Sequence, residues 1–180
     1  MRIYLVGYMG SGKSTVSNKL AHQLGYNCFD LDDLFEQRFK ITVADFFTKY
    51  DESLFRRLES QLLKETAVLD DVVIATGGGT PCFYDNMEWM NRLGLTVFLE
   101  ISVPAIVSRL NNSKKKRPLL MNKTESEINK FIHDHLRHRN IYYSQAQLIV
   151  PAVSINVLKL EEQIRNNWLS KYNSHTSFEQ

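Results

Sequence analysis

The sequence predicts an α/β protein built in three layers, with a central five-stranded parallel sheet flanked by helices. Short apolar runs without polar alternation recur along the chain, and such runs are typical of strands buried on both faces. Amphipathic helical patterns separate the runs, and strands that alternate with helices form parallel sheets through crossover connections. The length of 180 residues fits one domain. We expect that domain to cover residues 1–172 and a flexible tail to cover residues 173–180.

Five short apolar runs are the expected strands. In chain order they cover residues 3–6, 27–30, 72–75, 96–99 and 148–150. The second run ends in the carboxylate of Asp30, whereas the third leads into Thr76 and three glycines. Because ligands of open parallel sheets gather outside the carboxyl ends of the strands, both of these ends are candidate parts of a site.

Capping and periodicity mark three helices between the strands. The first begins near Lys13, and the second follows an Asp51 cap and runs to about residue 69. The third opens at Thr124 with capping-box spacing and continues past Arg139. The charged, weakly periodic stretch over residues 111–123 interrupts the pattern, and we expect it to form a mobile lid.

Composition and charge exclude several classes of protein. Hydrophobic residues make up 43% of the chain and charged residues 23%, which is ordinary globular composition. The net charge of +2 is too small for a basic nucleic-acid-binding face. Two cysteines cannot form a disulfide framework, and no apolar stretch is long enough to span a membrane. We therefore expect a cytoplasmic protein with neither a nucleic acid nor a membrane as partner. We also expect a monomer, although composition and charge do not determine the oligomeric state.

A phosphate-binding motif directly follows the first expected strand. Residues 7–14 match G-x-x-x-x-G-K-[ST] and lead into the first expected helix. Glycines let backbone N–H groups turn toward phosphate oxygens, Lys13 supplies a full charge to the outer phosphates, and the Ser14 hydroxyl suits magnesium. The motif predicts nucleoside triphosphate binding, but it does not identify the phosphate acceptor. The expected ATP-binding residues are Gly10, Ser11, Gly12, Lys13, Ser14 and Thr15.

Two acids near the end of the second strand can serve magnesium and the acceptor. No acid ends the third strand, so Asp30 and Asp32 are the available carboxylates at this edge. The alternative is a capping role, because Asp32 and Asp33 stand where a helix begins and acids favour that position.

Arg56 and Glu59 lie three residues apart on the Asp51 helix, where an acid can hold a guanidinium in one orientation. One interpretation is a carboxylate clamp, because the planar fork of arginine matches two oxygens, with Arg139 as a second clamp. The other is a surface salt bridge of little energetic value. Glycines 77–79 allow a ligand to rest directly on the backbone, or they form a simple loop.

Taken together, these motifs resemble the shikimate kinase family. The phosphate cradle is followed by Asp-x-Asp at residues 30–32, Phe-Arg-x-x-Glu at 55–59, Gly-Gly-Gly at 77–79, Arg-Pro-Leu at 117–119, and Arg139 to Tyr142. The order and intervals fit from residue 1 to about residue 172. The resemblance implies a P-loop kinase fold with a lid, and transfer of the ATP γ-phosphoryl group to the 3-hydroxyl of shikimate.

The resemblance also implies roles for the residues that bind shikimate. Asp32 binds the hydroxyls and orients or deprotonates the attacking one. Arg56, Arg139 and the backbone at Gly78 hold the carboxylate. Two aromatic side chains, Phe47 and Phe55, form walls for the ring.

Further roles concern ATP and magnesium. The resemblance implies that Ser14 binds Mg²⁺ directly and that Asp30 binds it through water. Lys13 is expected to be catalytic, as a cation at the phosphates. Arg117 moves in with the lid, contacts ATP and neutralises phosphate charge. The stretch 151–156 departs from the family pattern after the last strand, so the adenine contacts there stay open.

Two other functions fit parts of this pattern. A kinase of the same build for another polyol acid, such as gluconate, shares the phosphate cradle. A nucleotide-binding module that regulates a partner shares it too, but has no need of Asp32 or Arg117.

Overall fold

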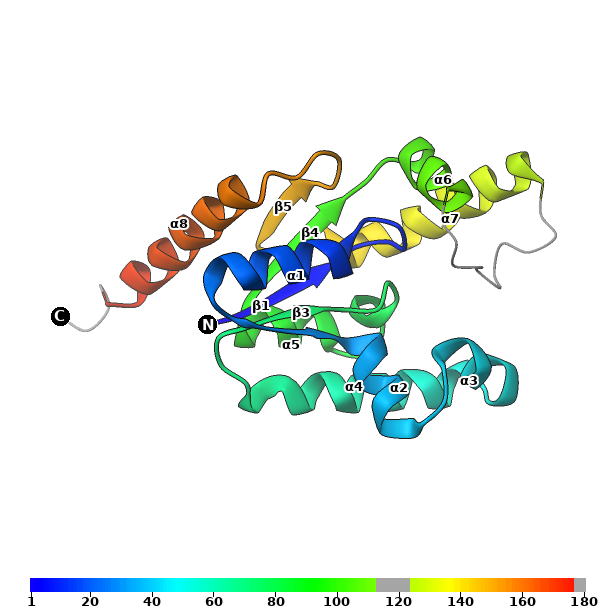
Figure 1. Ribbon diagram of the computed structural model, residues 1–180, viewed down its shortest axis with the longest axis horizontal. Coiled ribbons are helices and arrows are strands. Elements are labelled where there is room, and N and C mark those ends of the chain that lie inside the picture. The colour runs from blue at the N-terminus through cyan, green and yellow to red at the C-terminus, as the bar shows by residue number, and fades with distance from the viewer. Residues whose placement is uncertain (113–123, 177–180) are drawn as a thin grey trace.

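In the computed structural model, which describes residues 1–112 and 124–176, five parallel strands form one sheet (Figure 1). The strand order is β2-β3-β1-β4-β5. The strands are β1 Arg2–Val6, β2 Asn27–Asp30, β3 Val72–Ala75, β4 Leu95–Glu100 and β5 Leu148–Pro151. The predicted five-stranded parallel sheet is confirmed.

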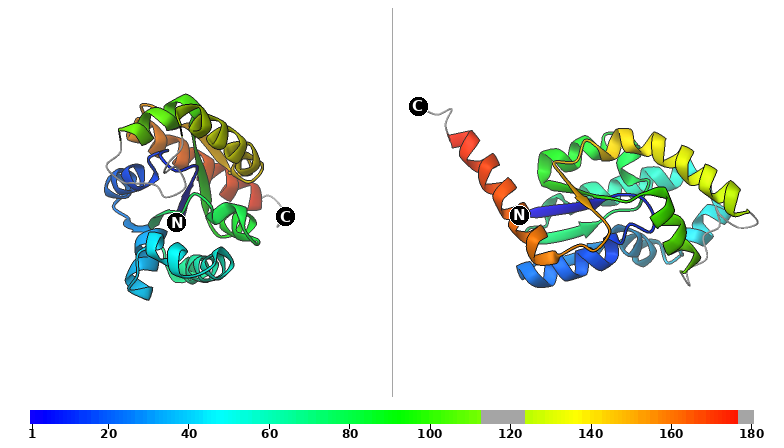
Figure 2. Two further views of the ribbon diagram at one scale, coloured as in Figure 1. Left: turned by 90° about the vertical axis from the view of Figure 1, so that its right-hand side faces the viewer. Right: turned by 90° about the horizontal axis from the view of Figure 1, so that it is seen from above.

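Helices cover both faces of the sheet, which gives the three layers that the sequence predicts. Viewed from above, α1 and the start of α8 lie on one face, and α5 and α7 lie on the other (Figure 2). The α-helices are α1 Lys13–Leu24, α2 Leu31–Phe39, α3 Val43–Lys49, α4 Glu52–Glu65, α5 Asn86–Leu93, α6 Val103–Asn111, α7 Glu125–Tyr143 and α8 Val157–Thr176. Two 3₁₀ turns complete the described elements, η1 Thr66–Val68 and η2 Thr80–Cys82.

The central strands are buried on both faces, as their unalternating apolar sequences predict. Every residue of β3 is buried, and the residues of β1 from Ile3 to Val6 have no exposed surface. In the register, Ala75 lies opposite both Leu5 of β1 and Asp30 of β2. The carboxyl ends of these three strands are therefore level, and the loops that follow them lie along one edge.

The two helices with predicted caps begin where those caps predict, and the first helix begins at Lys13. Asp51 caps α4 by accepting a hydrogen bond from Leu54 N at 2.8 Å. Thr124 and Glu127 form both halves of the predicted capping box at the start of α7. Helix α4 ends at Glu65, and the expected helical stretch to about residue 69 continues as η1.

The last helix enters the stretch expected as a C-terminal tail. Helix α8 continues to Thr176, so residues 173–176 are helical rather than part of a tail. Neither glycine nor proline occurs between Val157 and Thr176, so nothing in the sequence breaks the helix there. Of the expected lid, Asn111 ends α6, while residues 113–123 lie outside the described part of the chain.

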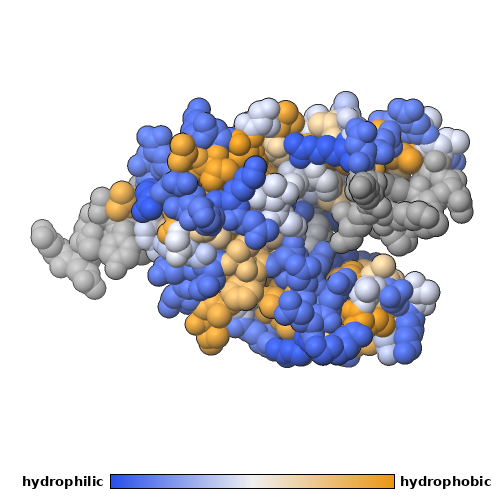
Figure 3. Space-filling view, viewed as in Figure 1, coloured by the Kyte–Doolittle hydropathy of each residue, from blue (hydrophilic) through white to orange (hydrophobic). Residues whose placement is uncertain are grey.

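The surface agrees with the ordinary globular composition. Figure 3 shows a mainly hydrophilic face with apolar surface gathered over β5 and the start of α8, where Ile149 and Leu158 are exposed. None of the described helices has an apolar stretch of the length that crossing a bilayer requires.

Candidate active site

The phosphate-binding motif forms a tight loop between β1 and α1. Its backbone needs glycine at Gly10 and Gly12, whose φ angles of +80° and +94° lie in the left-handed region. Gly12 is the N-cap of α1, so the first N–H groups of that helix point into the loop. The Lys13 ammonium donates to the Gly7 and Tyr8 carbonyls at 2.8 and 3.1 Å and lies across the loop. The arrangement is a phosphate cradle with a positive helix end and a cation.

Asp30 joins the cradle to the second strand. The Ser14 hydroxyl donates to Asp30 Oδ2 at 2.6 Å, and Asp30 Oδ1 accepts from the backbone N of Asp32 at 3.0 Å. Asp30 therefore caps α2, and Asp32 lies in the first turn of that helix. The capping function that the sequence left open for Asp32 belongs to its neighbour Asp30.

Ser14 and Asp30 also fit the first requirements of a magnesium site. Mg²⁺ prefers hard oxygen ligands, keeps several waters, and is usually bound by one or two side chains together with substrate phosphates. A hydroxyl and a carboxylate in contact at the start of α1 supply that kind of donor set beside the cradle.

Arg56 is held in one orientation by two carboxylates. Its Nη1 lies 2.9 Å from Glu59 Oε2, and its Nη2 lies 3.0 Å from Glu52 Oε1. Arg56 is 8% exposed and Glu59 is 2% exposed, so the interpretation as a surface salt bridge is wrong. Burial alone would lower the pKa of the guanidinium, but the two carboxylates outweigh it and raise that pKa.

A polar network fixes Glu59 in turn. The Thr80 hydroxyl donates to Glu59 Oε1 at 2.6 Å, and the Asn86 side chain donates to the Thr80 carbonyl at 2.9 Å. Ser60 completes the network by donating to Asn86 at 2.7 Å. These partners come from α4, η2 and α5, and no local sequence motif marks them.

Aromatic rings surround the Arg56 guanidinium. Its carbon lies 4.4 Å from the ring centre of Phe83, 5.1 Å from that of Phe55 and 5.8 Å from that of Phe47. Phe47 and Phe55 are the two walls that the sequence suggests, and their ring centres are 4.5 Å apart. Phe83 was missed because it lies outside every recognised motif.

The three glycines after β3 bring the other site residues together. A methyl group at Gly77 would lie 3.1 Å from Asp32 Oδ1, and one at Gly78 would lie 3.3 Å from Arg139 Nη1. A methyl group at Gly79 would lie 2.6 Å from both terminal nitrogens of Arg56. One short loop is thus in contact distance of a carboxylate and two guanidinium groups, each from a different helix.

Gly78 also touches the cradle. A methyl group there would lie 3.4 Å from the Met9 backbone N, and the Tyr143 hydroxyl donates to the Gly78 carbonyl. The triglycine loop and the phosphate cradle are therefore neighbours, so a ligand held at the loop would lie beside a ligand held in the cradle.

Arg139 differs from Arg56 in its surroundings. It lies on α7, with its guanidinium carbon 5.5 Å from the centre of the Tyr8 ring. Within the described residues, no acidic group forms an ion pair with Arg139, whereas Arg56 has two such partners. Arg139 is the cation of this site that a ligand carboxylate can neutralise.

The other predicted residues are placed as follows. The Ser11 side chain is buried, and within the described residues its hydroxyl has no hydrogen-bond partner. Thr15 lies in the first turn of α1 and is exposed. Arg117 falls in the segment outside the described residues.

Arg109 is a residue of the cradle that sequence reasoning missed. From α6, its Nη1 donates to the Gly10 and Ser11 carbonyls at 2.9 and 3.0 Å, and its Nη2 donates to the Ala152 carbonyl at 2.8 Å. It therefore ties the cradle to the loop after β5. No signal in the sequence distinguishes this arginine, because its partners are backbone atoms 43 to 99 residues away.

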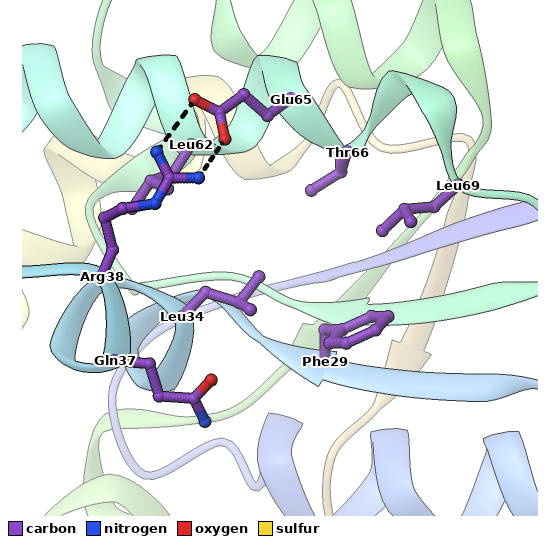
Figure 4. Close-up of a pocket in the computed structure, with 8 residues that line it drawn as sticks. All are labelled: Phe29, Leu34, Gln37, Arg38, Leu62, Glu65, Thr66 and Leu69. Atoms are coloured by element: carbon purple, nitrogen blue, oxygen red, sulfur yellow. Dashed lines mark hydrogen bonds and ion pairs between the residues drawn. The ribbon is translucent and has the colours of Figure 1, made fainter.

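A separate pocket lies between α2 and α4 beside the edge strand β2 (Figure 4). Its volume is about 530 Å³, and the Arg38–Glu65 ion pair at 2.6 Å borders it. Its lining consists of Phe29, Leu34, Gln37, Arg38, Leu62, Glu65, Thr66 and Leu69. None of these is a predicted site residue, so this pocket is distinct from the site at the strand ends.

Comparison with known proteins gives a consistent family. The model of the shikimate kinase family matches residues 9–172. A shikimate kinase of Phocaeicola vulgatus is 46% identical over 151 residues, which cover 84% of this chain and 86% of that protein.

Solved structures agree with the sequence comparison. A shikimate kinase from Bacteroides thetaiotaomicron has a TM-score of 0.87 at 43% identity, covering 92% of this chain and 98% of that one. A shikimate kinase from Acinetobacter baumannii in complex with shikimate has a TM-score of 0.81 at 32% identity, covering 94% and 93%. A gluconokinase from Sinorhizobium meliloti reaches 0.53 at 13% identity, with coverage of 98% and 97%, which shows a shared fold alone.

Proposed function

The chain belongs to the shikimate kinase family, and we propose that it phosphorylates the 3-hydroxyl of shikimate with ATP through the roles assigned below. The observation that carries the assignment is the approach of Asp32, Arg139 and Arg56 to three successive glycines beside the phosphate cradle. Shikimate has a carboxylate at one end and hydroxyls at the other. A site that binds it therefore needs cations at one end and a carboxylate side chain at the other.

The two arginines bind the carboxylate of the substrate. Arg56 is already oriented by Glu59 and Glu52, so its remaining donor directions are fixed before the substrate binds. Arg139 takes its counter-charge from the substrate, and the backbone at Gly78 lies between the arginines. Phe47 and Phe55 flank the guanidinium of Arg56 and offer apolar surface to the ring of the substrate.

Asp32 acts on the attacking hydroxyl. Its carboxylate lies near Gly77, and its backbone N donates to Asp30, which accepts from Ser14 of the cradle. There it accepts a hydrogen bond from the hydroxyl and orients the oxygen toward the γ-phosphorus. It takes the proton as the oxygen–phosphorus bond forms and the bond between the γ-phosphorus and the bridging oxygen breaks, which releases ADP.

The cradle residues hold ATP in line with that hydroxyl. The backbone of residues 10–15 surrounds the phosphates, and Lys13 supplies charge to the outer ones. Ser14 would hold Mg²⁺ directly and Asp30 would hold it through water, and the bound ion would neutralise phosphate charge. Arg117 adds a further cation at the phosphates. Alignment and charge neutralisation supply most of the catalysis in phosphoryl transfer.

An acceptor panel tests the proposed function against its rivals. ADP release is followed with ATP and Mg²⁺ in the presence of shikimate, gluconate or no acceptor. We expect release to require shikimate. Faster release with gluconate would favour a polyol-acid kinase of another specificity, and nucleotide binding without any acceptor-dependent release would favour a regulatory module.

A variant at Asp32 tests the assignment of the proton acceptor. Asp32→Asn keeps the shape of the side chain and removes its basicity, so kcat should fall by about 10²- to 10⁴-fold. Affinity for ADP should stay within about 2-fold, because the side chain does not act on the nucleotide. Asp33→Asn, on the exposed side of the same helical turn, is the matched control. A loss of equal size in the control would overturn the assignment.

A further inference from the structure

Tyr8 of the phosphate cradle is joined to helix α7. Its side chain is completely buried, and its hydroxyl lies 3.0 Å from Nδ1 of His135. The two rings are nearly perpendicular, with centres 5.7 Å apart. The same Tyr8 ring faces Arg139, whose guanidinium carbon is 5.5 Å from its centre. One aromatic side chain of the cradle therefore touches two successive turns of α7.

The spacing on α7 explains how both contacts are possible. His135 and Arg139 are four residues apart, and residues at this spacing are neighbours on one face of a helix. Tyr143, four residues further, donates its hydroxyl hydrogen to the Gly78 carbonyl. This face of α7 lies along both the cradle and the triglycine loop.

The hydrogen bond between Tyr8 and His135 joins two neutral groups. Burial raises the pKa of the Tyr8 phenol to about 12, with the charge of Arg139 opposing the shift. Burial and then the charge of Arg139 lower the pKa of His135 to about 4. Near neutral pH neither group changes its charge, so the contact persists and fixes the plane of the Tyr8 ring.

A ring in that position suits an arginine that must present its donors to an anion. The face of an aromatic ring attracts a cation, and a guanidinium over that face keeps its N–H donors in its own plane. Within the described residues Arg139 has no acidic ion-pair partner, so neutral groups restrain it before the substrate binds: the Tyr8 ring, and the Tyr143 side chain through a hydrogen bond.

We propose that Tyr8, held by His135, is a positioning residue that orients Arg139 for the substrate carboxylate. The inference rests on the proposed function, which assigns Arg139 to that carboxylate. It adds a physical link between the two halves of the site, because the residue that restrains the acid-binding arginine is part of the phosphate cradle.

Tyr8→Leu and Tyr8→Phe separate the ring from the hydroxyl. Loss of the ring in Tyr8→Leu should weaken shikimate binding by about 3- to 10-fold, the range expected for a partly desolvated cation–π contact. Tyr8→Phe keeps the ring and should stay within about 3-fold of the wild type. ADP affinity, measured by direct titration, should change by less than about 2-fold in both variants, because their backbone cradle is intact.

Combining Tyr8→Leu with Arg139→Ala decides between positioning and general structural support. If Tyr8 acts through Arg139, then Tyr8→Leu weakens shikimate binding in the wild type and has no further effect in Arg139→Ala. Equal losses in both backgrounds, or a loss of ADP affinity as large as that of shikimate affinity, would overturn the proposal. Shikimate affinity that is nearly retained in Tyr8→Phe but reduced in Tyr8→Leu would support it.

A second cycle tests the hydrogen bond. His135→Leu and Tyr8→Phe should each weaken shikimate binding slightly, and their combination should be no worse than the worse single variant. Additive losses would overturn the part of the proposal that concerns His135. His133→Leu, exposed on the same helix, is the control. If Arg139→Ala leaves shikimate affinity unchanged, the proposed role of Arg139 in binding the carboxylate is wrong. The inference about Tyr8 depends on that role and is then wrong as well.

Discussion

The two arginines of the site illustrate two ways to keep a cation ready for a ligand. Arg56 is 8% exposed and has ion pairs with Glu59 and Glu52 at 2.9 and 3.0 Å. Arg139 is less buried and rests against the ring of Tyr8. A buried ion pair loses much solvation, so Arg56 contributes orientation more than stability. In the proposed function, the substrate carboxylate supplies the counter-charge that Arg139 lacks among the described residues.

Removing Arg56 should separate acid binding from nucleotide binding. Arg56→Ala should weaken shikimate binding by about 10²-fold or more, as for a truncated partner of a buried charge pair. ADP affinity should remain within about 2-fold, because Arg56 contacts the triglycine loop rather than the cradle. Titration of both ligands measures the two effects. Arg57→Ala, the exposed neighbour on α4, is the control, and equal losses of both ligands would contradict the assignment.

The same variant should also be less stable. Glu59 is 2% exposed and would keep a buried charge without its partner, which costs about 3–5 kcal/mol. Adding Glu59→Gln to Arg56→Ala should recover much of the lost melting temperature while shikimate binding stays weak. Recovery of shikimate binding together with the melting temperature would show that Arg56 acts through the fold alone.

His135 should make stability depend on pH. Its pKa is lowered by burial and by Arg139 to about 4, with Glu52 opposing the shift. An unfolded histidine titrates near about 6.5, so between these values the unfolded chain binds a proton that the folded chain does not. Stability therefore falls as the pH decreases through this window, and the group has no effect on stability above it.

Melting curves of matched variants measure this dependence. Between about pH 7 and pH 4.5, the wild type should lose melting temperature relative to His135→Gln, which cannot titrate. His133→Gln, exposed on the same helix, should follow the wild type. An identical pH dependence in all three proteins would show that His135 is not held in its neutral form.

At the scale of elements, α6 and α7 turn a phosphate-binding loop into one half of a larger site. Helix α7 carries Tyr143 against the Gly78 carbonyl and Arg139 against the same glycine. Helix α6 carries Arg109 against two carbonyls of the cradle. Both helices follow the cradle by roughly 100 residues or more in sequence. The site is therefore complete only when the sheet has formed and both helices have packed against it.

Arg109 offers a test of how α6 supports the cradle. Arg109→Ala removes three hydrogen bonds from a charged donor to backbone carbonyls, each worth about 1.5–3 kcal/mol where it is shielded from water. We expect a lower melting temperature and an ADP affinity reduced by about 10-fold or more, while shikimate affinity changes less. Arg137→Ala, exposed on α7, is the control. Unchanged ADP affinity would show that the cradle holds its shape without α6.

At the scale of the whole molecule, the sequence predicts those features that depend on neighbouring residues. The cradle is one contiguous motif, the Thr124–Glu127 capping box spans four residues, and Glu59 lies three residues from Arg56. Each forms from local geometry, so its spacing alone is informative. The strand sequences likewise predict a buried parallel sheet, because their apolar runs suit strands covered on both faces and helical patterns alternate with them.

The remaining features depend on distant pairs. Tyr8 and His135 are 127 residues apart, and Arg109 binds Gly10 at a separation of 99. No periodicity or motif joins such residues, because their contact is fixed by strand order and by the packing of α6 and α7. Helix α8 continues into the stretch expected as a tail for another reason, since low apolar content does not stop a helix that lacks glycine and proline.

The central claim is that the phosphate cradle and the two arginines form one site for ATP and shikimate. A crystal structure of the full chain with ADP, Mg²⁺ and shikimate tests it most directly. We expect the ADP phosphates on residues 10–15, the shikimate carboxylate in contact with both Arg56 and Arg139, and a ring hydroxyl within hydrogen-bond distance of Asp32. Shikimate bound elsewhere, or with its carboxylate away from both arginines, would contradict it.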